Sequence, residues 1–202
     1  MEHQVFAQPL RDLSANDREG MFRLRYETFR VRLGWDVETT DDGLEIDQFD
    51  GEDSQYILAK SPEDDIDACW RLLPTLGPNM LRDVFPQLLN GQPAPAAADV
   101  WELSAFALAT DRLAAAEQAG NYQLSFGPLS VKLMAEAARL AKARGIVRYV
   151  TVTTAAIERM LKKQGLHIHR LGPPVKIGNV LTLACFIEVD SMTLNAVGVQ
   201  GG

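Results

Sequence analysis

The chain has 202 residues, enough for one domain that buries a core without disulfides or a metal. Apolar residues make up 47% and charged residues 23%, as in ordinary soluble globular proteins, and the net charge of −7 argues against general nucleic-acid binding. The segment 1–10 lacks a basic stretch followed by an apolar run, and no segment is long enough to span a membrane. Both cysteines, Cys69 and Cys185, stand in apolar runs, which is typical of buried thiols in a reducing compartment. We expect a single domain over 1–202 that is soluble and cytoplasmic, with no membrane or nucleic-acid partner.

The charges are divided unevenly between the two halves of the chain. Residues 1–110 hold 9 Lys or Arg against 21 Asp or Glu, whereas residues 111–202 hold 11 against 6. Solvated surface of mixed sign accounts for most single charges. A division this uneven within one domain still suggests two partners, a cation at the acidic end and an anion at the basic end.

The spacing of apolar residues predicts helices and strands that alternate in the second half. Helical spacing runs over 18–32, after a possible cap at Ser14 or Asn16, and over 129–144, where Gly145 supplies the stop. The acidic segment 39–53 contains Asp-Asp-Gly and Asp-Gly and predicts an exposed loop. The other expected elements are strands at 56–59, 68–73, 100–108, 146–153 and 180–189, a loop at 86–99 and a short helix at 155–163. These elements indicate an α/β/α sandwich with a mixed central sheet in one domain.

Charged and aromatic residues of the first half form a pattern. Arg71 and Glu102 lie inside apolar strands, where charges are rarely buried unless they are paired. Three carboxylates stand within six residues, and an arginine with two aromatic residues precedes them. Each group has a simpler interpretation, as a solvated turn or as ordinary core and surface. The three carboxylates are Glu45, Asp47 and Asp50. The arginine and the two aromatic residues before them are Arg25, Phe29 and Trp35.

The order and spacing of these groups resemble the family of LuxI-type acyl-homoserine-lactone synthases. The matching segments are RYETFRVRLGW (25–35), EIDQFD (45–50), RLLPT (71–75), VFP (84–86), WELSAF (101–106), VTVTTAAIERML (150–161) and LGPPVKIG (171–178). The resemblance covers nearly the whole chain. It implies a fold akin to the Gcn5-related N-acetyltransferases. It also implies a reaction in which the amine of S-adenosylmethionine attacks an acyl thioester and the carboxylate then closes the lactone, releasing methylthioadenosine.

One position departs from the family pattern. The family has arginine directly after the serine of Trp-Glu-x-Ser, and this chain has Ala105. We expect the missing cation to leave Glu102 without a partner and to impair activity, unless another cation covers the position. A homologue that only binds S-adenosylmethionine or the carrier is therefore an alternative.

The residue types suit such a substrate. Aromatic faces such as Phe29 and Trp35 attract a sulfonium by about 0.5–2 kcal/mol. Asp47 and Asp50 would favour the bound cation and orient its amine, while the guanidinium of Arg25 or Arg71 matches the two oxygens of the substrate carboxylate. The resemblance adds Phe85 and Ser104 to the residues that bind S-adenosylmethionine, which is a substrate, so no cofactor is expected.

The attacking amine must be neutral, so a group must accept its proton. Glu102 is the candidate base, directly or through a water, and Asp47, Asp50 and Arg71 complete the candidate catalytic set. Carboxylates that lie close together raise one another's pKa, which suits a base that works near neutrality.

The second half offers candidates for the acyl donor. Acyl carrier protein is acidic, so Arg144, Arg148, Lys162 and Lys163 are candidates to dock it, with acyl-CoA as the other possible donor. Solvated helix faces explain these charges equally well. The residues expected to line an apolar tunnel for the acyl chain are Met134, Val150, Val152 and Leu183, joined by Thr153 or Thr151 for a 3-oxo group.

Other classes of chemistry lack the residues they need. The histidines are His3, His167 and His169, and a His-x-His pair in a strand is more often surface than a metal site, so no metal is expected. Neither cysteine has a basic neighbour that would make it a nucleophile. An ordinary N-acetyltransferase stays open as an alternative, although the glycine-rich loop of that class is not evident around 126–133.

Overall fold

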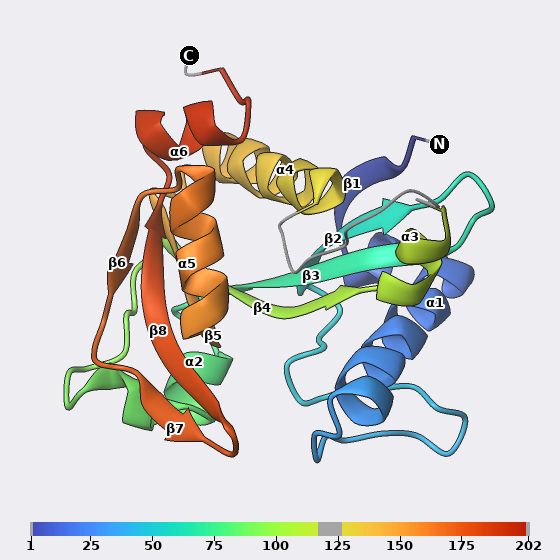
Figure 1. Cartoon of the computed structure of the whole chain (residues 1–202), viewed down its shortest axis with the longest axis horizontal. Helices are drawn as coiled ribbons and strands as arrows, with labels where there is room; N and C mark the ends of the chain where they lie inside the picture. The colour runs from blue at the N-terminus through green and yellow to red at the C-terminus, as the bar shows by residue number, and fades with distance from the viewer. Residues whose placement is uncertain (1, 117–126, 201–202) are drawn as a thin grey trace.

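The protein is built on one mixed sheet (Figure 1). The computed structural model describes residues 2–116 and 127–200. The strand order of the sheet is β1-β2-β3-β4-β5-β8-β6, with β7 paired to β8. Among the strands of the described residues, β4 and β5 are parallel neighbours and the other pairs are antiparallel. The strands are β1 (Gln4–Pro9), β2 (Gln55–Lys60), β3 (Ile66–Pro74), β4 (Val100–Leu108), β5 (Arg148–Thr154), β6 (Ile168–Arg170), β7 (Val175–Ile177) and β8 (Val180–Glu188).

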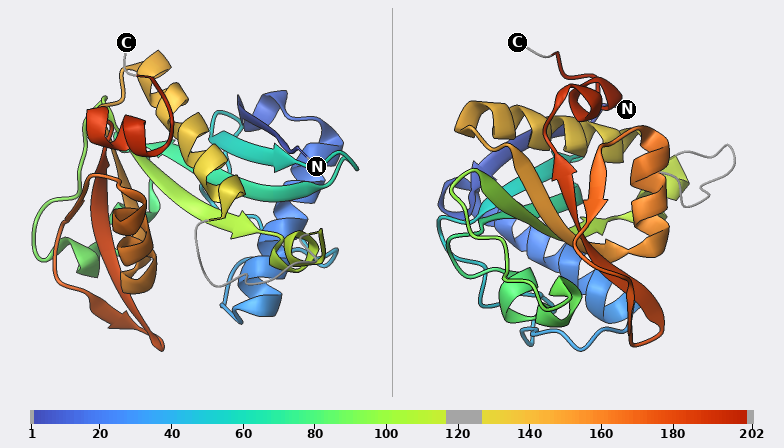
Figure 2. Two further views of the ribbon diagram at one scale, coloured as in Figure 1. Left: turned by 45° about the horizontal axis from the view of Figure 1, so that its top comes forward. Right: turned by 90° about the vertical axis from the view of Figure 1, so that its left-hand side faces the viewer.

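Helices cover both faces of the sheet (Figures 1 and 2). One face carries α4 over β1 and β2, together with α5 over β5 and β8, and the other carries α1 over β3 and β4 and α2 beside β4 and β5. The α-helices are α1 (Ala15–Arg25), α2 (Met80–Asp83), α3 (Thr110–Ala116), α4 (Pro128–Arg144), α5 (Ala155–Gln164) and α6 (Ser191–Ala196). Shorter or irregular turns are η1 (Leu10–Asp12), η2 (Tyr26–Arg32) and η3 (Pro86–Leu89). The predicted α/β/α sandwich is confirmed.

Local sequence explains where the helices begin and end. The Ser14 hydroxyl accepts the Asp17 backbone N–H and caps α1, as predicted. The helix then continues as the π-helical segment η2, so the helix expected over 18–32 is present but changes its winding at Tyr26. Gly145 ends α4 with a φ of 70°, which a residue without Cβ adopts at little cost.

The sheet opens between β4 and β5. These strands pair only over Val100–Leu103 and Arg148–Thr151, although both continue further. Beyond that point β4 contains a bulge opposite β3, where Ala105 has a φ of 50°. The two halves of the sheet therefore diverge after Leu103 and Thr151, as Figure 1 shows.

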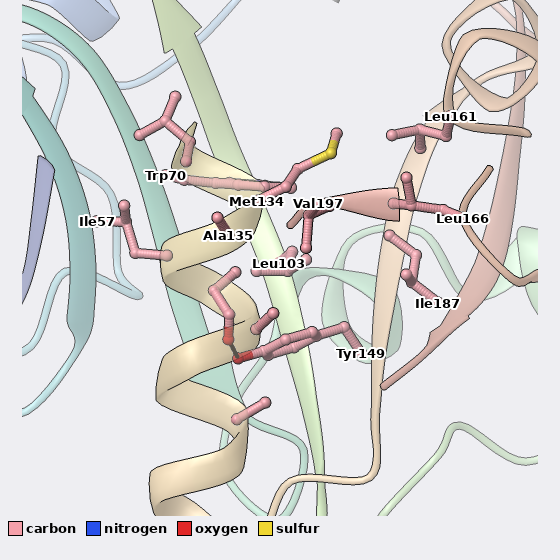
Figure 3. Close-up of a cluster of buried hydrophobic side chains, with 14 of the residues drawn as sticks. Ile57, Trp70, Leu103, Met134, Ala135, Tyr149, Leu161, Leu166, Ile187 and Val197 are labelled. Carbon is pink, nitrogen blue, oxygen red and sulfur yellow. Dashed lines mark hydrogen bonds between the residues drawn. The ribbon is translucent and has the colours of Figure 1, made fainter. Parts of the chain in front are cut away.

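Strand alternation divides the core into clusters on the two faces. Leu103 and Tyr149 point toward α4, in the cluster that Figure 3 shows, where the Tyr149 hydroxyl donates to the Ala137 carbonyl. Val150 points the other way, into a smaller cluster with Leu81. A third cluster lies between α1 and the sheet.

The expected elements are present, with one clear error. The segment 39–53 contains no regular element, but it is not an exposed loop throughout, because Glu45 and Phe49 are only 3% and 5% exposed. The sequence analysis missed β1, α2, α3, β7 and α6. Both cysteines are buried, and burial raises the pKa of each thiol to about 12. Part of the segment 126–133 lies outside the described residues, and within them no helix is long and apolar enough to cross a membrane.

Candidate active site

Two arginines and three carboxylates lie together in a buried cluster, which is called the ionic cluster below. They are Arg25, Glu45, Asp47, Asp50 and Arg71. Arg25 comes from the end of α1 and donates from Nε to Glu45 at 2.5 Å and from Nη1 to Asp50 at 2.7 Å. Arg71, from the middle of β3, donates to Asp47 at 2.6 and 3.0 Å and to Asp50 at 2.7 Å. The sequence analysis suggested these arginines for the substrate carboxylate. In the structure both guanidinium groups face carboxylates of the protein itself.

The ionic cluster holds one more carboxylate than guanidinium groups. Its arginines are fully buried, and the side chains of Glu45 and Asp50 are 4% and 0% exposed, against 19% for Asp47. A bound cation would neutralise the excess negative charge, and Asp47 is the carboxylate that can meet it.

The pKa values differ from the expectation that neighbouring carboxylates raise one another. Burial raises the pKa of Asp50, but the charges of Arg25 and Arg71 lower it by more, so it lies well below the ordinary value. Glu45 has a raised pKa, and the main cause is burial rather than its acidic neighbours. The expectation was therefore wrong for Asp50, because it left the two buried guanidinium groups out.

Glu102 lies on β4 beside α2. Its carboxylate accepts the backbone N–H groups of Met80 at 2.9 Å and of Leu81 at 2.7 Å, at the start of that helix. Burial raises its pKa, although the two amides act in the opposite direction. The expectation that Glu102 lacks a partner without an arginine at position 105 was wrong, since backbone amides satisfy it.

Ser104 and Ala105 lie at the bulge of β4. The Ser104 hydroxyl accepts the Nε–H of Arg71 at 3.1 Å, so it supports the ionic cluster. Ala105 packs against the apolar cluster that contains Phe29, on the α1 side of the sheet. A longer side chain at position 105 would start from the face that carries the ionic cluster.

Phe29 and Trp35 form a stacked pair, with ring centroids 5.4 Å apart and 7° between the planes. Phe29 is buried, whereas Trp35 is 51% exposed and is not a core residue. The pair therefore presents one indole face that a cationic ligand could contact. Phe85 lies elsewhere, partly buried against the cluster around Leu81.

The six residues expected along the acyl chain do not share one surface. Met134 and Leu183 belong to the core on the α4 side, whereas Val150 and Val152 face the α2 side, because successive strand residues point to opposite faces. The Thr151 hydroxyl donates to the Leu103 carbonyl at 2.9 Å. The Thr153 hydroxyl forms no hydrogen bond with the described residues, although its backbone lies in the β5–β8 ladder.

The four residues expected to dock a carrier are largely paired. Arg144 donates to Gln55 and lies over the Trp101 ring, and Arg148 pairs with Glu188 at 3.2 Å. Lys162 lies 2.7 Å from Glu158, which also binds Arg170 and has a pKa lowered to about 2 by hydrogen bonds from Arg170 and Lys162. Lys163 is exposed at the end of α5.

Two supporting residues escaped the sequence analysis. Tyr56, fully buried on β2, donates its hydroxyl to Asp50. Met80 places its sulfur 3.3 Å from Nη2 of Arg71. Tyr56 stands in an apolar strand next to the strand that contains Arg71, and this pattern could have identified it from the sequence. Met80 stands in a segment without helical periodicity, so no comparable pattern indicated it.

Comparison with known proteins identifies this arrangement. The model of the family described as autoinducer synthase matches residues 10–197. The chain is 38% identical over 184 residues to the acyl-homoserine-lactone synthase of Pseudomonas aeruginosa, covering 90% of this chain and 86% of the relative. It is also 38% identical over 187 residues to that of Aliivibrio fischeri, covering 92% and 93%. The chain belongs to the autoinducer synthase family.

Solved acyl-homoserine-lactone synthases share the fold. The crystal structure of the AHL synthase LasI superposes with a TM-score of 0.86 at 33% identity, covering 100% of this chain and 98% of the other. The ternary complex of TofI with an inhibitor and MTA gives 0.81 at 34%, covering 98% and 97%. The CoA-dependent synthase BjaI, with SAM and isopentyl-CoA, gives 0.83 at 25%, covering 99% and 92%. An acyl-CoA N-acyltransferase from Pseudomonas aeruginosa, 14% identical with a TM-score of 0.60, shares the fold alone. The autoinducer synthase is thus an acyltransferase with this α/β fold.

Proposed function

We propose that the enzyme makes an acyl-homoserine lactone from S-adenosylmethionine and acyl carrier protein, as a quorum-sensing signal. The observation that carries this proposal is the excess carboxylate of the ionic cluster, which becomes partly exposed at Asp47. S-adenosylmethionine brings a sulfonium and an ammonium, and a site with surplus negative charge favours both. The exposed face of Trp35, stacked on Phe29, supplies a second cation-binding surface.

Two steps account for the product. The neutral amine attacks the thioester carbonyl carbon, the carbon–sulfur bond breaks, and the carrier leaves as a thiol after taking a proton. One oxygen of the methionine carboxylate then attacks the γ-carbon, the bond to the sulfonium sulfur breaks, and methylthioadenosine leaves. The second step needs no protein nucleophile, because positioning the carboxylate in line is worth effective molarities on the order of 10⁵ M or more.

Glu102 is proposed to accept the proton of the amine, directly or through a water. Each carboxylate oxygen has two lone pairs, so the amides of Met80 and Leu81 leave Glu102 able to take a proton. Its raised pKa favours this role near neutrality. Asp47 is proposed to orient the ammonium, while Arg71, Asp50 and Ser104 hold Asp47 in place.

The acyl chain is proposed to enter where β4 and β5 diverge and to run along the α4 side of the sheet. An apolar cavity there is lined by residues that include Trp70, Leu103, Met134 and Tyr149. Thr153 lies beyond the last β4–β5 pair, on the same face of β5 as Tyr149, and its hydroxyl could donate to a 3-oxo group.

Acyl carrier protein is proposed as donor because the second half of the chain is basic, and Lys163 is exposed at the end of α5. The test offers the same acyl chain on carrier protein and on CoA, with lactone measured by mass spectrometry. A higher kcat/KM for the carrier supports this donor. Lys163→Glu should raise KM for the carrier, and this increase should be larger at lower salt concentration. KM for the CoA donor should stay unchanged. Preference for CoA would overturn this donor and leave lactone synthesis intact.

The role of Asp47 is tested with a matched pair of substitutions. Asp47→Asn should raise KM for S-adenosylmethionine about tenfold or more, since a charge-assisted contact is worth about 1.5–3 kcal/mol. Asp42→Asn removes a carboxylate from the exposed part of the same segment and should leave this KM unchanged. Equal KM values for both variants would show that the ionic cluster does not bind the cation.

A further inference from the structure

His167, a histidine that this function leaves unused, lies in a hydrogen-bond network at the C-terminal segment. His167, between α5 and β6, donates from Nδ1 to Asp190 at 2.5 Å, and its backbone N–H donates to the Thr193 hydroxyl at 3.0 Å. Asp190 also accepts the Thr193 backbone N–H at 3.1 Å and so caps α6. Burial raises the pKa of Asp190, but the hydrogen bonds from His167 and Thr193 lower it overall. One imidazole therefore joins the loop after α5 to the first turn of α6.

The same network borders the apolar cavity described above. Thr193 and Val197 form part of its lining, as does Leu166, the residue before His167. Figure 3 shows Val197 between Met134 and Leu103 on one side and Leu166 and Ile187 on the other. The segment 190–199 thus forms part of the wall of the cavity through Thr193 and Val197.

The cavity is too small for a long acyl chain as it stands. Its volume is about 20 Å³, which is near the space one water needs. Most of its wall consists of central strands and the 17-residue helix α4. The remaining wall is Leu166, Val189, Thr193 of the six-residue helix α6 and Val197. A short terminal helix has a smaller buried surface than the central strands or α4, so it is displaced at the lower cost.

We propose that the His167–Asp190 pair latches the segment 190–199 against the acyl cavity and thereby limits the length of the acyl chain. This inference rests on the proposed function. Because the cavity has space for little more than a water, every acyl chain must displace part of its wall, and a longer chain must displace Val197 further and work more against the latch. His167 and Asp190 act as positioning residues, and Val197 is the residue of the latched segment whose side chain the longer chains must displace.

The experiment measures kcat/KM for a series of straight-chain acyl donors and compares the ratio of long to short donors between variants. His167→Ala should raise this ratio about two- to tenfold, the worth of one hydrogen bond. His167→Asn keeps a side-chain N–H near the position of Nδ1 and should restore the wild-type ratio. His169→Ala is the matched control. The exposed His169 ring lies next to the His167 ring, with centroids 4.4 Å apart, but His169 does not bind Asp190, so its loss should leave the ratio unchanged.

A second pair of variants tests the wall without the latch. Val197→Ala should raise the ratio about tenfold, since one methylene in an apolar pocket discriminates by that much or more. Val199→Ala changes another buried valine of the same segment, 8% exposed against 5% for Val197, that is not part of the cavity lining, so it should leave the ratio unchanged. KM for S-adenosylmethionine should stay constant throughout.

The outcomes separate the latch from the underlying function. A partly unfolded variant lowers turnover of every donor by one factor and does not change the ratio. An unchanged ratio in His167→Ala and Val197→Ala, with lactone still made, overturns the latch alone. An equal rise in Val199→Ala and His169→Ala also overturns it. A wild-type protein that makes no lactone from any donor overturns the proposed function and the latch together.

Discussion

Loss of Arg71 should destabilise the fold strongly, because its buried guanidinium pairs with the fully buried Asp50 and the partly exposed Asp47. Replacing it by methionine keeps most of its apolar volume and removes its hydrogen bonds to Asp47, Asp50 and Ser104. Asp50 would keep Arg25 and Tyr56 as partners, but Asp47 would lose its bidentate partner. Breaking a buried pair by removing one partner costs about 3–5 kcal/mol. We expect Tm to fall by about 6–20 °C, at about 2–4 °C for each kcal/mol in a chain of this size.

The loss should depend on pH with a definite sign. In the wild type the pKa of Asp50 is lowered, so its contribution to the free energy of unfolding is present above the unfolded pKa and is lost as pH falls through the folded value. Without Arg71 the pKa of Asp50 rises toward or above the unfolded value. The penalty of Arg71→Met should therefore shrink as pH is lowered from neutrality toward about 4.

Thermal unfolding measures the fall in Tm, and urea unfolding monitored by tryptophan fluorescence at several pH values measures how the free-energy penalty varies with pH. Arg139→Met is the matched control, because Arg139 forms an exposed pair with Glu136 at 2.9 Å and should cost less than about 1 kcal/mol. A penalty for Arg71→Met as small as that of the control, or one that does not vary with pH, would refute the reasoning.

Two further predictions concern catalysis. Ala105→Arg adds a cation on the face of the ionic cluster, so it should increase kcat and lower the pKa of Glu102. The acidic limb of the kcat/KM profile should then move to lower pH, and identical pH profiles would mean that Ala105 is no defect. Thr153→Val should lower turnover of 3-oxo donors relative to unsubstituted donors a few-fold, about 0.5–1.5 kcal/mol, as measured by competition between the two donors. Thr151→Val is its control, because that hydroxyl already donates to Leu103; an equal change in both variants would contradict the assignment.

The sequence predicted the elements with strong periodicity and the composition of the ionic cluster. Helix α4 and strand β4 begin and end within a residue of expectation, because apolar spacing and Gly145 mark them. The short elements were missed: β7 and α6 span 3 and 6 residues, too few for a periodic pattern.

The partners within the site could not be predicted, because they depend on tertiary contacts. The sequence placed Glu102 in an apolar strand and indicated that it must be paired. That its partners are the amides of Met80 and Leu81 follows from where the segment before β4 folds back. The pKa of Asp50 depends in the same way on two arginines that are distant from it in the chain.

The position of the acyl residues shows a limit of another kind. Alternation along β5 already implied that Val150 and Val152 face away from Thr151 and Thr153. Which face carries the cavity depends on α4 and α6, and α6 was not expected. The role of segment 190–199 therefore emerged only from the folded chain.

The central claim is tested most directly by the stoichiometry of products from the purified wild-type enzyme. S-adenosylmethionine and an acyl carrier are supplied, and mass spectrometry follows lactone and methylthioadenosine over time. The account predicts that both appear in equal amounts, at a rate that depends on both substrates. Methylthioadenosine without lactone, acyl transfer from acetyl-CoA to another amine, or tight binding of S-adenosylmethionine without either product would contradict it.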